Sequence, residues 1–292
     1  MSFQIFLILF MDGLLLSGVY ALAALGFVII YRATGVFNFA QGEFMMVGAY
    51  VFYLFFIQAD LTFAVAVVLA IGGLGLIGAG IYLLVLRQMT AQPLFATIIV
   101  TMGVAILLRS ATGIVWGANH FHIGRFLGGE YVSIGGLSFA VFDLLCLATI
   151  AAVFIVVMGF LRFSPIGLEM RASAENPTLA SQRGVNLNTV FAVSWAIAAA
   201  TAAIAGGIAA SRGSVTPELA HLGIAALPAA LVGGLDSVGG VVVGGLIVGF
   251  AHTTAAWFWG PDTQDVISGL LLLAVLMIRP YGVFGSHHIA RV

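Results

Sequence analysis

Residues 61–86 read LTFAVAVVLAIGGLGLIGAGIYLLVL, an apolar stretch of 26 residues without a charged side chain. A helix needs about 20 apolar residues to cross the roughly 30 Å hydrocarbon core of a bilayer. Other stretches of the chain reach the same length. The sequence therefore predicts a membrane protein built from transmembrane helices.

Composition supports this class. The chain is 62% hydrophobic and only 7% charged, whereas a soluble domain carries roughly 25% charged residues. It therefore lacks the polar side chains to cover a water-facing surface. We expect a single transmembrane domain over residues 1–292, an all-α polytopic membrane protein with about eight transmembrane helices and a short re-entrant or half-helix segment.

The expected helices follow the apolar runs. They cover residues 4–31, 41–58, 61–86, 94–116, 139–161, 187–211, 238–259 and 264–278. The shorter run 223–235 contains Pro228 and reaches only about 20 Å at 1.5 Å per residue. Irregular backbone at that depth survives only inside protein or beside a water-filled cavity. Gly233 and Gly234, at the end of this run, are therefore candidates for lining a path or gate.

Arginine placement predicts the orientation of the chain. Cytoplasmic loops are enriched in basic residues, and residues 162–188 carry the densest basic cluster. Counting helices gives five arginines on that side and two on the other: Arg32, Arg87, Arg162, Arg171 and Arg183 against Arg125 and Arg212. The N-terminus is then outside. The C-terminus is inside if run 223–235 crosses the membrane and outside if the run turns back, and the first choice agrees better with the charge rule.

Several functions are excluded or left without a site. All ten basic residues are arginine, and a Walker A site needs a lysine, so any ATP hydrolysis must occur on another subunit. The net charge of −1 gives no reason to expect a nucleic acid. No nucleophile–base–acid arrangement is present, so we expect no enzyme. His120 and His122, near Glu130, form a possible zinc site, but an ordinary external loop is the favoured interpretation.

The polar segment 162–188 reads RFSPIGLEMRASAENPTLASQRGVNLN. A break at Ser164-Pro165 precedes a helix-forming stretch at 167–174. A second short helix, 177–182, begins with a proline, which is favoured in the first helical turn. It stops at Gly184, because glycine is common just past a helix end. Such a segment either docks onto a soluble motor or is a solvated linker.

A second polar segment joins the first two apolar helices. Asn38, Gln41 and Glu43 lie here, and Glu43 is near a helix start, where negative charge is favoured. One interpretation makes Arg32 and Glu43 interfacial anchors and Asn38 a turn residue. The other makes Asn38, Gln41 and Glu43 part of a translocation path or gate.

Three motifs in order carry a resemblance: GVFNFAQGEFMMVGAY at 35–50, IGLEMRASAENPTLASQRGVNLN at 166–188 and LVGGLDSVGGVVVGGLIVG at 231–249. Together they resemble the branched-chain amino acid ABC transporter permease family. The likeness is to the first permease subunit of the high-affinity leucine/isoleucine/valine uptake type, and it covers nearly the whole chain. Permeases for urea, short amides and aromatic acids look similar, so the family is better specified than the solute.

The resemblance implies an assembly in the bacterial inner membrane. A homologous second permease subunit would complete the pathway, two cytoplasmic ATPase subunits would hold ATP and Mg, and an extracytoplasmic solute-binding protein would deliver cargo. No cofactor or metal would be bound by this chain itself. The ATPase-coupling residues that the family motif implies are Glu169, Met170, Arg171, Ala174, Glu175, Asn176, Ala180 and Gly184.

The chain departs from the family pattern at two positions. Gln41 stands where the family commonly has histidine, which puts any histidine-dependent role in doubt. Asp236 stands where glycine is frequent, which places an extra carboxylate beside the broken helix and makes Asp236 a further candidate for the path.

Ionisable groups inside spans are costly and are functional candidates. We expect Asp12 to pair with an arginine of another helix or to face a wet cavity. Arg109 lies roughly 10 Å along a helix from Trp116, so we expect it to snorkel toward the outer interface rather than contact a solute carboxylate. Asp143 is expected at the interface, and His252 as a packed or hydrogen-bonded residue.

Two rivals come from other classes. Secondary transporters and channels contain paired broken helices, and the breaks near 35–42 and 233–240 are compatible with an ion-coupled transporter that needs no ATPase. A structural membrane scaffold without transport is the third interpretation.

Overall fold

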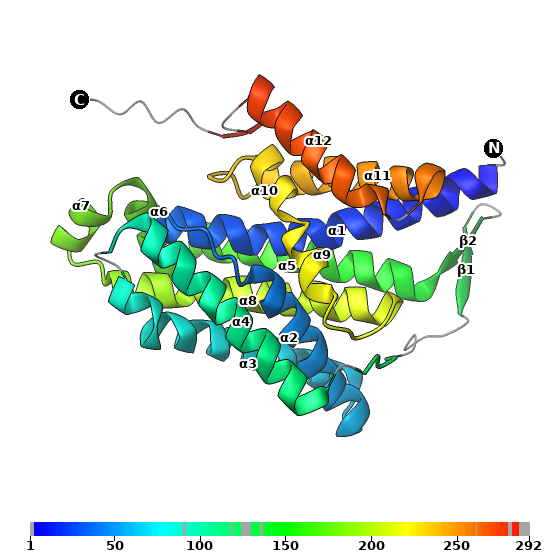
Figure 1. Cartoon of the computed structure of the whole chain (residues 1–292), viewed down its shortest axis with the longest axis horizontal. Helices are drawn as coiled ribbons and strands as arrows, with labels where there is room; N and C mark the ends of the chain where they lie inside the picture. The colour runs from blue at the N-terminus through cyan, green and yellow to red at the C-terminus, as the bar shows by residue number, and fades with distance from the viewer. Residues whose placement is uncertain are drawn as a thin grey trace.

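The computed structural model describes residues 3–89, 92–117, 119–123, 130–134, 137–260, 262–279 and 282–285. The first half of the described chain contains α1 (Phe3–Thr34), α2 (Gln41–Tyr53), the π-helical turn η1 (Leu54–Gln58), α3 (Phe63–Leu84), the 3-10 turn η2 (Leu86–Met89), α4 (Leu94–Trp116), β1 (Tyr131–Ile134) and β2 (Leu137–Ala140). The second half contains α5 (Val141–Phe163), α6 (Pro165–Glu175), α7 (Pro177–Gln182), α8 (Leu187–Arg212), α9 (Leu219–Ile224), α10 (Leu227–Gly233), α11 (Gly240–Trp259) and α12 (Thr263–Ile278). Figure 1 shows a helical bundle with the N-terminus and the β-strands at one end and α6 and α7 at the other.

The described residues confirm a polytopic helical membrane protein. Six helices are long and apolar enough to cross a membrane: Ile5–Thr34, Phe63–Leu84, Leu94–Trp116, Val141–Phe163, Leu187–Arg212 and Gly240–Trp259. The other two expected spans are shorter. The regular part of α2 has 13 residues before its π-helical turn, and α12 has 16.

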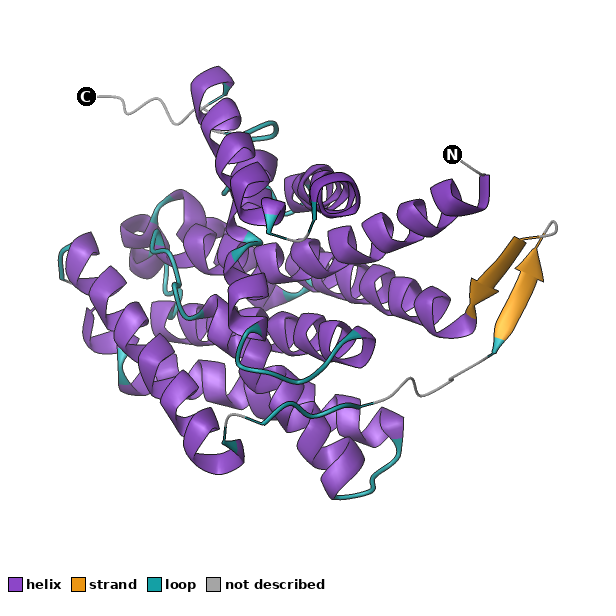
Figure 2. Cartoon of the chain, turned by 45° about the vertical axis from the view of Figure 1, so that its right-hand side comes forward, coloured by secondary structure: helices purple, strands orange, loops and turns teal. Residues whose placement is uncertain are grey.

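A β-hairpin just before the start of α5 was not predicted. Strands β1 and β2 pair antiparallel, with Phe139 opposite Val132, and Figure 2 shows them standing beside the end of the bundle. We expected Phe139 to begin a helix, but α5 begins at Val141 because Phe139 belongs to the hairpin.

Helix α1 forms the centre of the bundle. In its most apolar stretch 83% of residues are buried, against 17% in α4 and in α5. Glycines bring α11 against it, since a Cβ on Gly249 would lie 2.4 Å from the Ser17 Cα and one on Gly245 would lie 2.7 Å from the Ala21 Cβ. Small residues allow this close approach of helices in lipid. Helix packing is therefore the role of these two α11 glycines. Gly72 on α3 has no such role, because its added Cβ would meet nothing within 4 Å.

Helix α2 begins inside the bundle. The chain leaves α1 at Gly35, where φ is +70°, and residues 36–38 have no helical or strand structure. The Gln41 amide then donates to the carbonyls of Ala23 at 3.4 Å and Ala198 at 3.1 Å, both in the middle portions of their helices. The predicted helix over 41–58 is present as α2 followed directly by η1, and the second crossing therefore combines this helix with the irregular backbone at 36–38.

The short segment with Pro228 crosses the bundle as two half-helices, α9 and α10. Asp12 and Arg32 lie 20 residues apart on α1, which is about 30 Å along a helix. Arg212, just before α9, pairs with Asp12, whereas Asp236, just after α10, shares a cavity with Arg32. The segment thus runs from one end of the bundle to the other. Val283, close to the C-terminus, lies against the end of α10, since its N–H donates to the Val232 carbonyl at 2.8 Å.

Candidate functional site

The start of α2 carries a buried polar cluster. Asn38 and Gln41 are fully buried, and the Asn38 amide donates to the Gln41 side-chain oxygen at 3.3 Å. The Asn38 oxygen accepts from the Ala40 N–H at 3.0 Å, and the Phe39 N–H donates to the Thr101 hydroxyl of α4 at 3.3 Å. These bonds satisfy irregular backbone inside the bundle, as a lipid environment requires.

Glu43 extends the cluster to α4. Its carboxylate lies 2.8 Å from the Arg109 guanidinium. The Glu43 side chain is only 4% exposed, whereas that of Arg109 is 42% exposed. The second carboxylate oxygen, Oε2, is buried and has no hydrogen-bond partner among the described residues.

We had expected Arg109 to extend toward the outer interface. Its guanidinium instead reaches a carboxylate on a neighbouring helix. The physical reason is that an unpaired buried carboxylate is far costlier than a paired one. Sequence reasoning missed this pair because the two residues are 66 positions apart.

The two interrupted crossings meet at glycines. A Cβ on Gly223 of α9 would lie 2.6 Å from the Gly42 Cα. A Cβ on Gly42 would lie 2.2 Å from the Ala220 carbonyl oxygen. The start of α2 and the end of α9 are therefore in direct backbone contact beside the polar cluster.

Asp12 lies apart from this cluster, at the end of the bundle that carries the N-terminus (Figure 1). Its carboxylate is 2.5 Å from the Arg212 guanidinium of α8, and Asp143 of α5 lies 3.5 Å from the same guanidinium. Pairing with an arginine of another helix was one of the two expectations for Asp12. Arg212 therefore connects α8 to α1 and α5 at this end of the bundle.

His252 is a packed, hydrogen-bonded residue, as expected. Its Nδ1 lies 2.8 Å from the Tyr20 hydroxyl and its Nε2 lies 2.7 Å from the Ser268 hydroxyl. The side chain is fully buried. His252 therefore connects α11 to α1 and α12.

The remaining path candidates lie at the opposite end from Asp12. Gly234 ends α10 with φ +104°, and a Cβ on Gly233 would lie 2.3 Å from the Gly240 carbonyl oxygen. Asp236 follows in the turn before α11 and lines a cavity beside Arg32. The predicted path residues thus occupy three separate places. Asn38, Gln41, Glu43 and Arg109 form the cluster at the start of α2. Asp12 lies at one end of the bundle, and Gly233, Gly234 and Asp236 lie at the other.

The predicted coupling segment forms two capped helices. The Ser164 hydroxyl accepts from the Gly167 N–H at 2.8 Å, and Pro165 opens α6. The Asn176 side chain accepts from the Leu179 N–H at 2.9 Å at the start of α7. Helix α7 has the predicted bounds. Helix α6 is longer than the predicted 167–174 because Ser164 and Pro165 cap and start it rather than break it.

Part of this segment faces the bundle. Met170 and Ala180 are each 6% exposed. The Arg171 guanidinium donates to the Leu161 carbonyl at the end of α5. A Cβ on Gly167 would lie 2.5 Å from the Phe160 carbonyl oxygen. Helix α6 is therefore packed tightly against the end of α5.

The other face of the segment is open. Of the predicted coupling residues, Glu175, Asn176 and Gly184 are exposed, while Glu169 and Ala174 are half-buried. Sequence reasoning overlooked two leucines, Leu168 and Leu179, which are 60% and 58% exposed. Large apolar side chains in an otherwise polar loop were the available signal. We call Leu168 and Leu179 the exposed leucine pair.

Glu218, in the connection between α8 and α9, has a shifted pKa. A hydrogen bond from the Thr216 side chain, assisted by a backbone N–H and by His120 and His221, lowers the pKa of Glu218. Within the described residues, no group of three or more metal-binding side chains is found. Arg125, counted as external, lies outside the described residues.

Residues 9–276 match the family model described as branched-chain amino acid transport system / permease component. The chain belongs to this permease family. Among the relatives of the permease, the high-affinity branched-chain amino acid transport system permease protein LivH of Escherichia coli (strain K12) is 29% identical over 311 residues, covering 100% of this chain and 99% of LivH. The high-affinity branched-chain amino acid transport system permease protein BraD of Pseudomonas aeruginosa is 28% identical, and the match covers 96% of each chain.

LivH of Salmonella typhimurium (strain LT2) is likewise 29% identical over the full chain. No solved structure matches the permease. The family recognised from the three motifs is confirmed, and its members are transport components rather than enzymes.

Proposed function

We propose that the chain is the transmembrane permease subunit of an ATP-driven importer for branched-chain amino acids or related small amino acids and carboxylates, in a bacterial inner membrane. Full-length relatives carry that transport system in their names. The observation that carries the proposal is the pair of capped helices α6 and α7, which present the exposed leucine pair at the arginine-rich end of the bundle.

The ATP-hydrolysing machinery belongs to partners in this proposal. The chain has no lysine for a Walker A site, so two cytoplasmic ATPase subunits would hold ATP and Mg. Their docking surface on the permease would be the open face of α6 and α7. Because α6 is bonded to the end of α5 through Arg171 and Leu161, a movement of α6 would carry α5 with it.

The transport path would form with a homologous second permease subunit, and a solute-binding protein would deliver cargo from outside. The meeting of α2 and α9 at Gly42 and Gly223 supports placing a gate there, since interrupted helices in transporters line such paths. In this proposal the half-exposed Arg109 guanidinium faces the carboxylate of a zwitterionic solute, and buried Glu43 holds that guanidinium in place.

Reconstitution tests this proposal. Liposomes would contain this chain, its second permease and the ATPases, with the binding protein and ¹⁴C-leucine outside. We expect uptake that requires ATP inside and is lost on Glu175→Trp, because bulk at an exposed position of α6 blocks docking. Uptake driven by an ion gradient through this chain alone would establish the rival class. ATP-driven uptake of urea or aromatic acids in place of leucine would reassign the solute within the family.

A further inference from the structure

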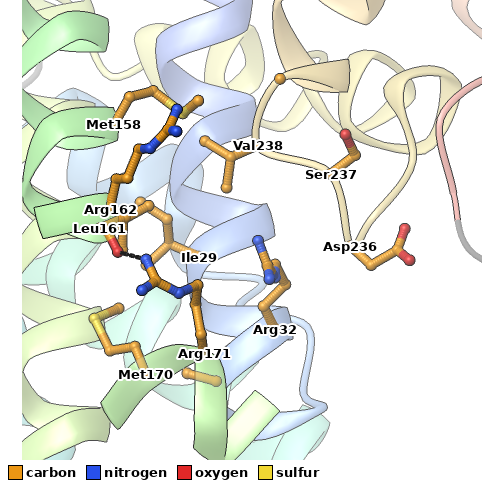
Figure 3. Close-up of a pocket in the computed structure, with 12 residues that line it drawn as sticks. Ile29, Arg32, Met158, Leu161, Arg162, Met170, Arg171, Asp236, Ser237 and Val238 are labelled. Carbon is orange, nitrogen blue, oxygen red and sulfur yellow. Dashed lines mark hydrogen bonds between the residues drawn. The ribbon is translucent and has the colours of Figure 1, made fainter. Parts of the chain in front are cut away.

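Three arginines from separate elements face one cavity at the arginine-rich end of the bundle (Figure 3). Arg32 comes from the last turn of α1, Arg162 from the end of α5 and Arg171 from α6. The cavity has a volume of about 320 Å³. It opens between these helices and the 236–239 turn.

The charge in this cavity is not balanced by the described part of the chain. None of the three arginines forms an ion pair with a described carboxylate. One N–H of the Arg171 guanidinium donates to the Leu161 carbonyl. Asp236 borders the cavity, but Figure 3 shows its carboxylate directed away from the three guanidinium groups. Each guanidinium has five N–H donors, so most donors around the cavity are available to a ligand.

The walls between the arginines are apolar. Ile29, Met158 and Val238 line the cavity. Ile29 lies near the end of α1, Met158 lies near the end of α5, and Val238 lies in the turn before α11. On α5 the same end of the helix continues into the exposed apolar residues Ile155 and Val156, which are 72% and 68% exposed. The site therefore joins a cationic pocket to a lipid-facing helix surface.

We propose that this cavity binds the phosphate headgroup of an anionic phospholipid of the cytoplasmic leaflet. Guanidinium groups match phosphate geometry and form strong charge-assisted hydrogen bonds with it. Basic pockets between transmembrane helices on the cytoplasmic side are typical sites for such headgroups. The apolar continuation along α5 accommodates acyl chains, which a free phosphate does not need.

The position of α6 argues against an acidic ATPase side chain as the occupant. Met170 of α6 lines the cavity and is buried, whereas Leu168 of the same helix is 60% exposed. Helix α6 therefore lies between the cavity and the proposed docking surface. A lipid bound here would connect α1, α5, α6 and the 236–239 turn, and so would stiffen the segment through which ATPase motion reaches the bundle.

Native mass spectrometry of the full-length chain in an uncharged detergent tests the proposal. Dimyristoyl phosphatidylglycerol is titrated against dimyristoyl phosphatidylcholine and against the soluble headgroup glycerol phosphate. We expect the wild type to bind the first phosphatidylglycerol more tightly than phosphatidylcholine. A surface arginine contributes about fivefold to affinity for anionic lipid. The double variant Arg32→Gln, Arg162→Gln should therefore bind phosphatidylglycerol about thirtyfold more weakly.

Matched variants separate charge from folding. Arg32→Lys with Arg162→Lys keeps the charge and should retain most of the affinity, and each single glutamine variant should lose about fivefold. Arg183→Gln removes an exposed arginine of the same polar segment that does not line the cavity, and it should bind as the wild type does.

Three results would overturn the proposal. The first is unchanged phosphatidylglycerol affinity in the glutamine variants. The second is glycerol phosphate binding as tightly as the lipid, which would make the ligand a soluble phosphate. The third is displacement of the lipid when the ATPase subunits are added, which would assign the cavity to an acidic side chain of that partner.

Discussion

The Arg109 guanidinium lies 2.8 Å from the Glu43 carboxylate and joins α4 to α2 within the bundle. The pair is asymmetric, since Glu43 is almost fully buried and Arg109 is about half exposed. Removing one partner of a buried pair leaves the other charge without compensation. The two partners should therefore differ in the cost of their removal.

Arg109→Gln should destabilise the permease more than Glu43→Gln does. The first change leaves a buried carboxylate unpaired and should cost about 2–3 kcal/mol, below the range for fully buried pairs because Arg109 is half exposed. In Glu43→Gln the arginine is free to turn outward, and the cost should be about 1 kcal/mol. Equilibrium unfolding in detergent measures both costs, and the double variant Arg109→Gln, Glu43→Gln completes a double-mutant cycle. Equal costs for the two single variants would show that the Glu43 carboxylate is not more deeply buried than the Arg109 guanidinium.

Gly223→Ala and Gly42→Ala should each impair folding and transport. The added methyl group would meet the Gly42 Cα at 2.6 Å or the Ala220 carbonyl oxygen at 2.2 Å, and overpacking of this kind costs about 1–3 kcal/mol. Thermal unfolding and leucine uptake are the measurements. Gly72→Ala is the control, because its Cβ would meet nothing within 4 Å. If all three variants behave alike, the contact between α2 and α9 is not tight.

Leu179→Asp should uncouple the permease without unfolding it. The side chain is 58% exposed, so stability should change by no more than about 0.5 kcal/mol. At a docking surface, loss of an anchor residue costs about 2 kcal/mol or more, enough to weaken ATPase binding at least tenfold. Co-purification with the ATPases and ATP-dependent uptake report this loss.

Gln182→Asp places the same charge on an exposed polar position of α7 and should have a much smaller effect on ATPase binding. Full uptake by Leu179→Asp would remove the exposed leucine pair from the docking surface.

Glu218 should give the folded state a small pH dependence below neutrality. Hydrogen bonding by Thr216 lowers its pKa in the folded protein from the ordinary 4.5. The contribution of Glu218 to the free energy of unfolding is therefore complete above its pKa in the unfolded chain, and it is lost as the pH falls through its pKa in the folded protein. Thermal unfolding of wild type and Glu218→Gln should converge as pH drops below about 4. Thr216→Val should return the pKa toward its ordinary value, and a carboxyl titration unchanged in that variant would contradict the assignment.

Local signals predicted much of the fold. Proline and asparagine at the start of α7 and glycine after its end act within one or two helical turns, so the bounds 177–182 agree with the structure. The six long spans were recognisable because an uninterrupted apolar run of sufficient length has only one stable form in lipid. The three motifs identified the family without any tertiary contact.

Long-range relationships could not be predicted in the same way. The run 41–58 looks like one helix entered from the membrane surface, yet α2 begins in the middle of the bundle because Gln41 binds carbonyls of α1 and α8. For run 223–235 the charge rule only favoured crossing over turning back, and the positions of Arg212 and Asp236 relative to α1 decided for crossing.

The sequence by itself determined that the chain spans the membrane many times, which end carries most of the arginines, and where α7 begins and ends. These properties follow from hydropathy, charge count and capping, which act over neighbouring residues. Tertiary structure alone decided that Glu43 pairs with Arg109, that Asp12 pairs with Arg212, and that three arginines surround one cavity. Such partners lie tens to hundreds of residues apart, and packing among several helices selects them, because each buried polar group needs whichever partner the bundle brings within reach.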